Sequence, residues 1–218
     1  MAKRTPQTVQ IDPSAPSSER SASERIVDVA RELFCRDGIH ATGIDRILAG
    51  AGASKMTLYT RFGSKEALVR EVLQREGSEW RASFFQAIEH AGGTAGERLL
   101  RVVAALDTWF NGGRFYGCSF MNAAAEHSKG EPMLREMAAQ HHRHVLDFLE
   151  KLTVEAGMTQ PTLVARQILL TIDGTIAALM VSGDPTVLPV AQRNLDLIVH
   201  QARPIPESPI RPGDKTIK

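Results

Sequence analysis

The amino-acid sequence predicts an all-α protein of about nine helices. Through most of the chain, apolar residues recur at spacings of three and four, which is the period of an amphipathic helix. Glycines, prolines and capping residues separate these segments. No segment alternates apolar and polar residues as a strand does, and we find no internal repeat. At 218 residues, the chain is long enough to bury a substantial core.

We predict four parts in the chain. Residues 1–21 contain three prolines and no apolar period, which predicts a disordered arm. Residues 22–76 form a predicted helical head, and residues 77–202 form a larger helical domain. Residues 203–218 contain four prolines, which predicts a flexible tail.

Residues 43–62 have the pattern of two short helices joined by a tight turn. The first helix carries its apolar residues on one face, namely Ile44, Ile47, Leu48 and Ala51. Gly52 can take the positive φ that ends this helix, and Ser54 can cap the next. The second helix has only Leu58 and Phe62 to bury, so its other residues face outward. Such a helix-turn-helix places its second helix in the DNA major groove.

The remaining helices follow from the same period and from signals at their ends. Ser64 caps a long helix, which Gly77 interrupts at a cost of about 1 kcal/mol relative to alanine. Thr94 and Glu97 have the spacing of a capping box. Predicted helices run from Ser23 to Asp37, from Ser64 to the break at 91–93, from Thr94 to Asn111, from Tyr116 to Glu126, from Met133 to Ala156, from Leu163 to Ser182 and from Asp184 to Ala202.

The distribution of charge is more informative than the net charge of +1. From Gly38 to Arg70 there are five basic and two acidic residues, a local charge of +3. From Gly77 to Ala202 there are ten basic and thirteen acidic residues, a local charge of −3. The positive charge therefore coincides with the helix-turn-helix, as binding to phosphates requires.

Several classes of protein are disfavoured. No apolar run approaches the roughly 18 residues that a membrane span needs, and no secretory signal is recognisable at the N-terminus. Two cysteines, Cys35 and Cys118, make no disulfide framework. A cytoplasmic location is therefore expected.

The head resembles the DNA-binding domain of the TetR (tetracycline repressor) family over about residues 22–76. The most specific mark is a Leu-Tyr-x-x-Phe-x-Ser-Lys-Glu run directly after the helix-turn-helix, from Leu58 to Glu66. One departure is Leu48, which stands where alanine is common in the family but keeps the site apolar. The resemblance is carried by Phe34, Gly38, Thr42, Ile47, Ala51, Gly52, Ser54, Leu58, Tyr59, Phe62, Gly63, Ser64, Lys65, Glu66 and Leu68.

The resemblance implies a ligand-responsive transcriptional regulator, most often a repressor released from its double-stranded operator by a small-molecule effector. It implies a homodimer through the last two long helices, at about 163–182 and 186–202. It also implies an effector cavity in the larger domain, which then serves ligand binding and dimerisation. A regulator whose pocket has no physiological ligand is a further possibility.

Matched residue by residue, Tyr59 and Lys65 correspond to the family's phosphate-contacting tyrosine and lysine. Lys55 can address guanine, and the Thr57 methyl can meet thymine, although Lys55 could instead touch phosphate only. For Arg46, an ion pair with Asp45 or Glu66 is as plausible as a backbone contact. The predicted DNA-binding set is Thr42, Arg46, Ser54, Lys55, Met56, Thr57, Tyr59, Thr60, Arg61 and Lys65.

The sequence indicates which residues line the implied cavity less specifically than it indicates the DNA-binding residues. Asp173 lies in the most apolar helix and needs a partner, either across the dimer or in the pocket. The predicted pocket set is Trp109, Phe110, Cys118, Phe120, Met121, Met137, His141 and Asp173.

Catalytic and metal sites are not predicted, and neither is a cofactor. His141 and His144 share a helical face, but they lack a third ligand at the expected spacing. The rival hypothesis is an enzyme with Cys118 as nucleophile and His127 or His141 as base, or a thiol sensor that uses Cys118. A small buried cysteine explains Cys118 without either role.

Overall fold

The computed structural model describes residues 21–113, 115–126 and 132–202. These residues form ten helices and no strand, which confirms the all-α prediction. Because α5 and α6 are one predicted helix broken at Leu100 and Arg101, the predicted count agrees with the observed one. The helices are α1 (Ala22–Asp37), α2 (Ile44–Ala51), α3 (Lys55–Phe62), α4 (Lys65–Glu89), α5 (Ala95–Leu99), α6 (Val102–Asn111), α7 (Ser119–Glu126), α8 (Pro132–Glu155), α9 (Pro161–Ser182) and α10 (Val187–Gln201).

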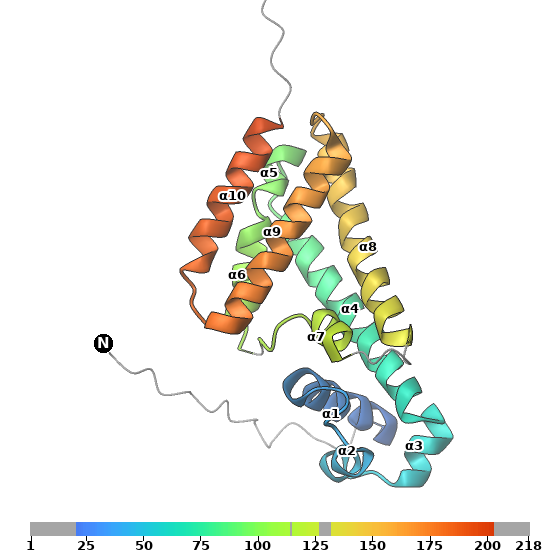
Figure 1. The fold of residues 1–218 in the computed structure, drawn as a ribbon. Coiled ribbons are helices and arrows are strands. Elements are labelled where there is room, and N and C mark those ends of the chain that lie inside the picture. Colours follow the sequence, from blue (N-terminus) through green and yellow to red (C-terminus); the bar gives the residue numbers. More distant parts are fainter. Residues whose placement is uncertain (1–20, 114, 127–131, 203–218) are drawn as a thin grey trace, which may run out of the picture.

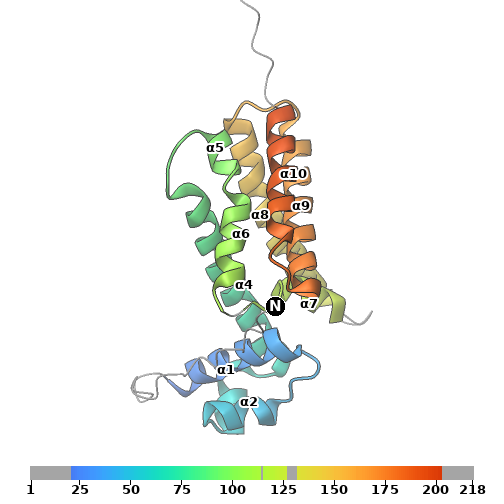
Figure 2. The same cartoon turned by 90° about the vertical axis from the view of Figure 1, so that its left-hand side faces the viewer.

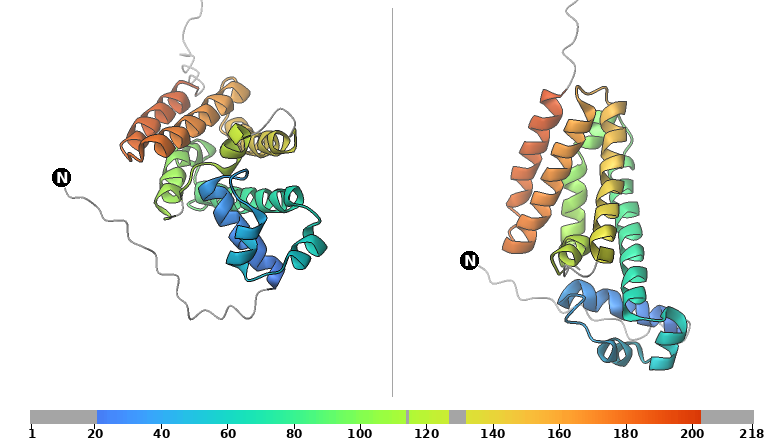
Figure 3. Two further views of the ribbon diagram at one scale, coloured as in Figure 1. Left: turned by 60° about the horizontal axis from the view of Figure 1, so that its bottom comes forward. Right: turned by 45° about the vertical axis from the view of Figure 1, so that its right-hand side comes forward.

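The described residues form a small head and a longer body, joined by α4 (Figure 1). The head contains α1, α2, α3 and the first part of α4. In the body, α5, α6, α8, α9 and α10 stand side by side above the head (Figure 2). The yellow-green α7 lies where the two parts meet (Figure 3). One apolar core fills the body and a second fills the head.

The head core extends past the predicted boundary at residue 76. Phe120 and Ala123 of α7 and Leu134 and Met137 of α8 belong to the same buried cluster as Ile47 of α2. The short helix α7 is therefore pressed between α1, α4 and α8. Residues from the larger predicted domain thus complete the core beneath the helix-turn-helix.

Local signals explain most helix ends. The Ser54 hydroxyl accepts from the Thr57 N–H at 3.1 Å, and Ser64 does the same for Ala67 at 3.2 Å, as their capping roles predict. Gly52 ends α2 in the left-handed conformation, with φ of 56°. A capping box on Thr94 opens α5.

Several boundaries differ from the sequence-based expectation. Helix α7 begins at Ser119 rather than at Tyr116. A capping box on Ser21, assigned to the arm, starts α1 one residue early. Pro161 occupies the first turn of α9, so this helix begins before Leu163. The Asp184 carboxylate accepts from the Thr186 N–H at 2.9 Å and holds a turn, so α10 begins only at Val187. The rest of the arm and the tail lie outside the described residues.

Gly77 does not interrupt α4, contrary to prediction. The helix is continuous from Lys65 to Glu89. A Cβ atom on Gly77 would lie 2.7 Å from Cζ of Phe120 and 2.8 Å from Nη1 of Arg81. The glycine therefore makes room for the Phe120 ring, and the close approach of α7 offsets the lower helix propensity.

Helix α9 is the one described helix that is long and apolar enough to cross a membrane by length and composition alone, with mean hydropathy of 1.5. This corrects the expectation that no segment approaches that criterion. Core helices of soluble proteins pass the same test, and α9 packs against α6, α8 and α10. Its buried side chains, including Ile168, Ile172 and Leu179, account for the high hydropathy.

Candidate functional site

Helix α3 presents most of its surface to solvent at the end of the head (Figure 1). Leu58 is its one fully buried side chain, with 0% exposed, and Phe62 is half-buried. Met56 is 78% exposed and Tyr59 is 50% exposed. The helix is thus anchored at one point, while its polar residues remain available to a partner.

Two of the basic residues on this surface carry acidic neighbours. The Lys55 ammonium lies 2.9 Å from Asp45 Oδ1, and this hydrogen bond raises the pKa of Lys55. The Arg46 guanidinium lies 2.8 Å from Asp37 Oδ2, which corrects the expected pairing with Asp45 or Glu66. Both cations are more than half exposed, so solvent weakens these pairs and the side chains can exchange their partners for phosphate.

The hydroxyl and arginine side chains on α3 are arranged around its first and last turns. Ser54 Oγ lies 3.0 Å from Thr57 Oγ1 at the N-terminus. Thr60 is exposed, and the Arg61 guanidinium lies 5.4 Å from the centre of the Phe62 ring. Ser54, Thr60 and Arg61 are exposed, as Met56 is.

Two of the residues predicted to contact DNA make hydrogen bonds within the head. Thr42 is 0% exposed, and its hydroxyl donates to the Gly38 carbonyl at 2.7 Å. This corrects the assignment of Thr42 to the DNA surface. The Lys65 ammonium donates to the Ile39 carbonyl at 2.7 Å, although an ammonium has two further protons to donate.

The sequence reasoning missed Arg25, which supports the turn of the helix-turn-helix. Its Nε donates to the Ala51 carbonyl at 2.9 Å, near the end of α2. Arg25 lies one turn into α1 and contacts the carbonyl end of another helix, a favourable place for a cation. The sequence alone does not show which helix end lies beside it.

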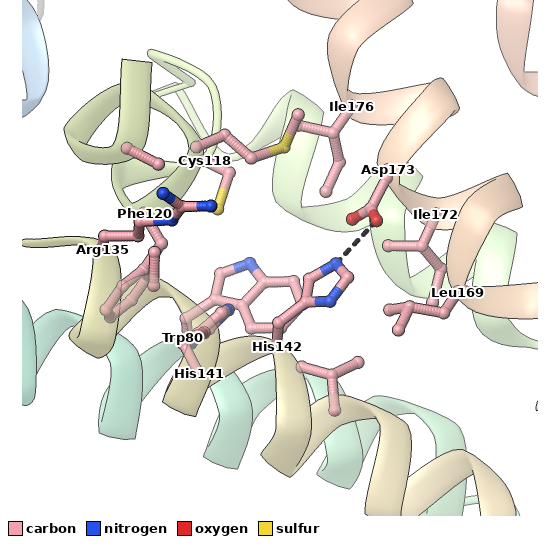
Figure 4. A pocket seen from close by; sticks show the side chains of 15 residues that line it. Trp80, Cys118, Phe120, Arg135, His141, His142, Leu169, Ile172, Asp173 and Ile176 are labelled. Atoms are coloured by element: carbon pink, nitrogen blue, oxygen red, sulfur yellow. Dashed lines mark hydrogen bonds and ion pairs between the residues drawn. The ribbon is translucent and has the colours of Figure 1, made fainter. Parts of the chain in front are cut away.

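A cavity of about 290 Å³ lies in the body between α4, α7, α8 and α9 (Figure 4). Five of the eight predicted pocket residues line it, namely Cys118, Phe120, Met121, His141 and Asp173. Trp109 and Phe110 do not, because they pack edge-to-face on Phe115. Met137 is turned into the head core and does not line this cavity.

The sequence reasoning missed Trp80, Arg135 and His142 as lining residues. Trp80 comes from α4, and His142 and Arg135 come from α8. None of the three is in the pocket set predicted from the sequence. The other wall residues are small or aliphatic, namely Ala124, Ala138, Ala139, Val145, Leu169, Ile172 and Ile176.

Asp173 has its partner inside the cavity. Its Oδ2 accepts from His142 Nε2 at 2.7 Å, so α8 and α9 are joined across the space (Figure 4). Of the two alternatives predicted for this carboxylate, this contact corresponds to the one within the pocket.

His141 lies beside this pair but is buried. Its ring stacks on Phe120 at 4.0 Å between centroids, and its Nδ1 lies 2.9 Å from Arg81 Nη1. Because a guanidinium can only donate, Nδ1 is the acceptor and the neutral ring carries its proton on Nε2. Burial, together with the charge of Arg81, lowers the pKa of His141 to about 3.

This shift predicts a loss of stability on acidification. Below about pH 6.5 the unfolded chain binds a proton at His141, whereas the folded chain binds it only near pH 3. Protonation of His141 therefore does not lower the free energy of unfolding above pH 6.5, and it lowers this free energy by about 2 kcal/mol at pH 5. Urea unfolding at pH 7 and pH 5 should show a smaller difference in His141→Gln than in the matched His144→Gln variant. Equal pH differences in both would contradict the assignment.

Neither thiol has the surroundings of a reactive cysteine. Burial raises the pKa of the Cys118 thiol and that of the Cys35 thiol. Cys35 Sγ lies 3.3 Å from Ser119 Oγ, and within the described residues no hydrogen bond joins either thiol to a histidine. His127, proposed as a base, lies outside the described residues. In the described part of the chain, no group of three His, Cys, Asp or Glu residues is placed to hold a metal.

Helix α7 connects the cavity to the head. Its first half supplies Phe120 and Met121 to the cavity wall. At its other end, the Glu126 carboxylate accepts from the Ile39 N–H at 3.1 Å and from the His40 N–H at 2.9 Å. The loop between α1 and α2 is thus held by a helix that also faces the cavity.

Residues 26–72 match the family model described as bacterial regulatory proteins of the tetR family. This stretch runs from the first turns of α1 into α4, and it contains the exposed α3 and the caps described above. The head of the chain is therefore similar to that of TetR-family regulators. This match agrees with the resemblance noted in the sequence.

Individual relatives match this chain over different lengths. The HTH-type transcriptional activator FasR of Mycolicibacterium smegmatis is 34% identical over 96 residues, which cover 44% of this chain and 41% of FasR. SCO4454, a TetR-family transcriptional regulator of Streptomyces coelicolor, has a TM-score of 0.77 at 25% identity and covers 83% of this chain and 95% of its own. The chain therefore spans less than half of FasR but nearly all of SCO4454.

A third relative has been solved on DNA. A cysteine mutant of CifR, a TetR-family transcriptional regulator, is complexed with a 26-base-pair double-strand operator. Its TM-score is 0.70 at 16% identity, with 79% of this chain and 94% of its own covered. At this identity, the likeness concerns the fold alone.

Proposed function

We propose that this chain is a DNA-binding transcriptional regulator of the TetR family, acting in the cytoplasm as a repressor that a small-molecule effector releases from its operator. The observation that carries the proposal is α3, a helix held by Leu58 while Met56 and Tyr59 stay exposed. A helix with this exposure at the end of a helix-turn-helix can enter the major groove.

The contacts divide by role. Tyr59 and Arg61 meet phosphates, and Lys65 does so with the protons not engaged by Ile39. Lys55 leaves Asp45 to read base edges with Met56 and Thr57. Arg46, Ser54 and Thr60 flank this surface and take part in backbone contacts. The basic head supplies the long-range attraction.

A homodimer through α9 and α10 would present two such helices to one duplex. Both helices expose large apolar side chains, among them Leu170 at 71% and Val181 at 84%. A Cβ atom on Gly174, between them on α9, would contact nothing within 4 Å in the described part of the chain. An apolar face with a gap in its middle suits close packing against a second copy. The remaining exposed apolar residues of this face include Leu163, Val190 and Leu197.

Effector control would pass through α7. A ligand that displaces Phe120 or Met121 moves the helix whose Glu126 holds the loop before α2. Such a ligand shifts the equilibrium only by its difference in affinity for the two arrangements, typically about 1–3 kcal/mol.

A gel-shift titration with the chain's own upstream region tests the proposal. We expect specific binding that weakens steeply with salt, with two chains on each duplex. Tyr59→Phe should weaken binding to specific and random duplexes alike, because it removes a phosphate contact. Lys55→Ala should in addition reduce the preference for the specific duplex by about tenfold. Binding that ignores salt, or equal effects of both variants on preference, would contradict the assigned roles.

A further inference from the structure

The polar side chains that line the cavity differ in whether they have hydrogen-bond partners in the described part of the chain. Asp173, its acidic wall residue, is already bonded to His142. Within the described residues, the Arg135 guanidinium has no ion pair or hydrogen bond, although it lines the same space. Figure 4 shows Arg135 on the Cys118 side, with His142 and Asp173 on the other.

A second polar group of the cavity also lacks a partner. The indole Nε1–H of Trp80 is buried and has no hydrogen-bond acceptor in the described part of the chain. An indole N–H and a guanidinium are both pure donors. Acceptor oxygens therefore match both donors of this site, and the guanidinium of Arg135 favours a negative charge beside it.

The rest of the wall sets the shape of the occupant. The other lining side chains are mainly aliphatic or aromatic, and the volume of about 290 Å³ corresponds to about ten water-sized groups at 30 Å³ each. Arg135 is exposed, so it marks where the cavity meets solvent. A charged group there stays partly hydrated, while an apolar body is removed from water.

We propose that the cavity takes a compact amphipathic anion, whose carboxylate-type oxygens bind Arg135 at the mouth while its apolar body packs against Phe120 and Ile172. The orphan N–H of Trp80 gives a second donor for an oxygen that reaches inside. This proposal rests on the proposed function, because it names the chemical class of the effector.

Octanoate, octylammonium and octanol form a matched series with the same tail and a different head group. In calorimetric titrations of the full chain, below the concentration at which the probes aggregate, octanoate should bind about tenfold more tightly than either of the others. Arg135→Gln should remove most of this advantage and leave the affinity for octanol unchanged. Arg143→Gln, an exposed arginine on the same helix outside the cavity, is the control and should change neither affinity.

Tryptophan fluorescence tests the location. The chain has two tryptophans, so Trp109→Phe leaves Trp80 as the single reporter. Octanoate should change the emission of Trp80 with the same midpoint as in calorimetry. Binding without a change in emission would place the ligand elsewhere and overturn the proposal.

Tighter binding of octylammonium, no binding of octanoate, or octanoate binding that Arg135→Gln leaves intact would each overturn the proposal. Its failure is separable from that of the proposed function. A chain that binds its upstream DNA but not octanoate remains a regulator with another effector class. A chain that binds octanoate at Arg135 but no DNA keeps the cavity chemistry and loses the regulatory role.

Discussion

Replacing Leu58 by alanine is expected to lower the free energy of unfolding by about 2–5 kcal/mol and to abolish specific DNA binding. Leu58 is fully enclosed and is the one fully buried side chain of α3. Removing it leaves a cavity beneath the helix and takes away the anchor that sets its position. Since native domains are stable by only about 5–15 kcal/mol, much of the population would lose an ordered α3.

Met56→Ala is the matched control for the stability part of this prediction, whereas its effect on DNA binding follows from the base-reading role proposed for Met56. Met56 lies on the same helix but its side chain is mostly solvated, so unfolding should change by less than about 0.5 kcal/mol. Urea unfolding followed by circular dichroism, with gel shifts on the same preparations, measures both quantities. A Leu58→Ala chain that keeps wild-type stability and DNA affinity would show that α3 is anchored in some other way.

Glu126→Ala should release the loop between α1 and α2 from α7. The carboxylate accepts from two backbone N–H groups of this loop, at Ile39 and His40, and such charge-assisted bonds are stronger than neutral ones. Their loss should cost about 1–3 kcal/mol, because the Ile39 N–H is partly buried and must find another acceptor. Amide hydrogen exchange should accelerate at Ile39 and His40, and the head should unfold before the body on heating.

Glu136→Ala is the control, because it makes the same change of charge at an exposed residue of α8. It should alter neither the exchange at residues 39 and 40 nor the coincidence of the two unfolding steps. If Glu126→Ala behaves in the same way, α7 does not hold the head, and the proposed route from the cavity to the DNA-binding surface would need replacement.

The success of the sequence-based predictions followed the range of the interactions involved. Caps at Ser54 and Ser64 and the left-handed Gly52 depend on residues within one turn, and all three were predicted correctly. The exposure of α3 followed from its sequence because it offers few large apolar residues. The assignment of individual DNA contacts remains a prediction.

Errors arose where packing beyond a single helix decided the outcome. The Thr42 hydroxyl was expected at the surface, but the packing of its loop turns it toward the Gly38 carbonyl. Arg46 found Asp37, which lies on another helix, rather than the acidic residues considered. The sequence predicts an interruption at Gly77, because it does not reveal that the Phe120 ring lies against this glycine.

By itself, the sequence determined the helical class, the helix-turn-helix and the resemblance of the head to the TetR family, because these depend on local periodicity, on capping and on a contiguous motif. Only the tertiary structure decided which residues surround the cavity, which donors in it lack an acceptor, and that Glu126 joins the cavity wall to the head. These depend on side chains from α4, α7, α8 and α9 that meet only when the helices pack, and helical periodicity does not specify which buried faces meet.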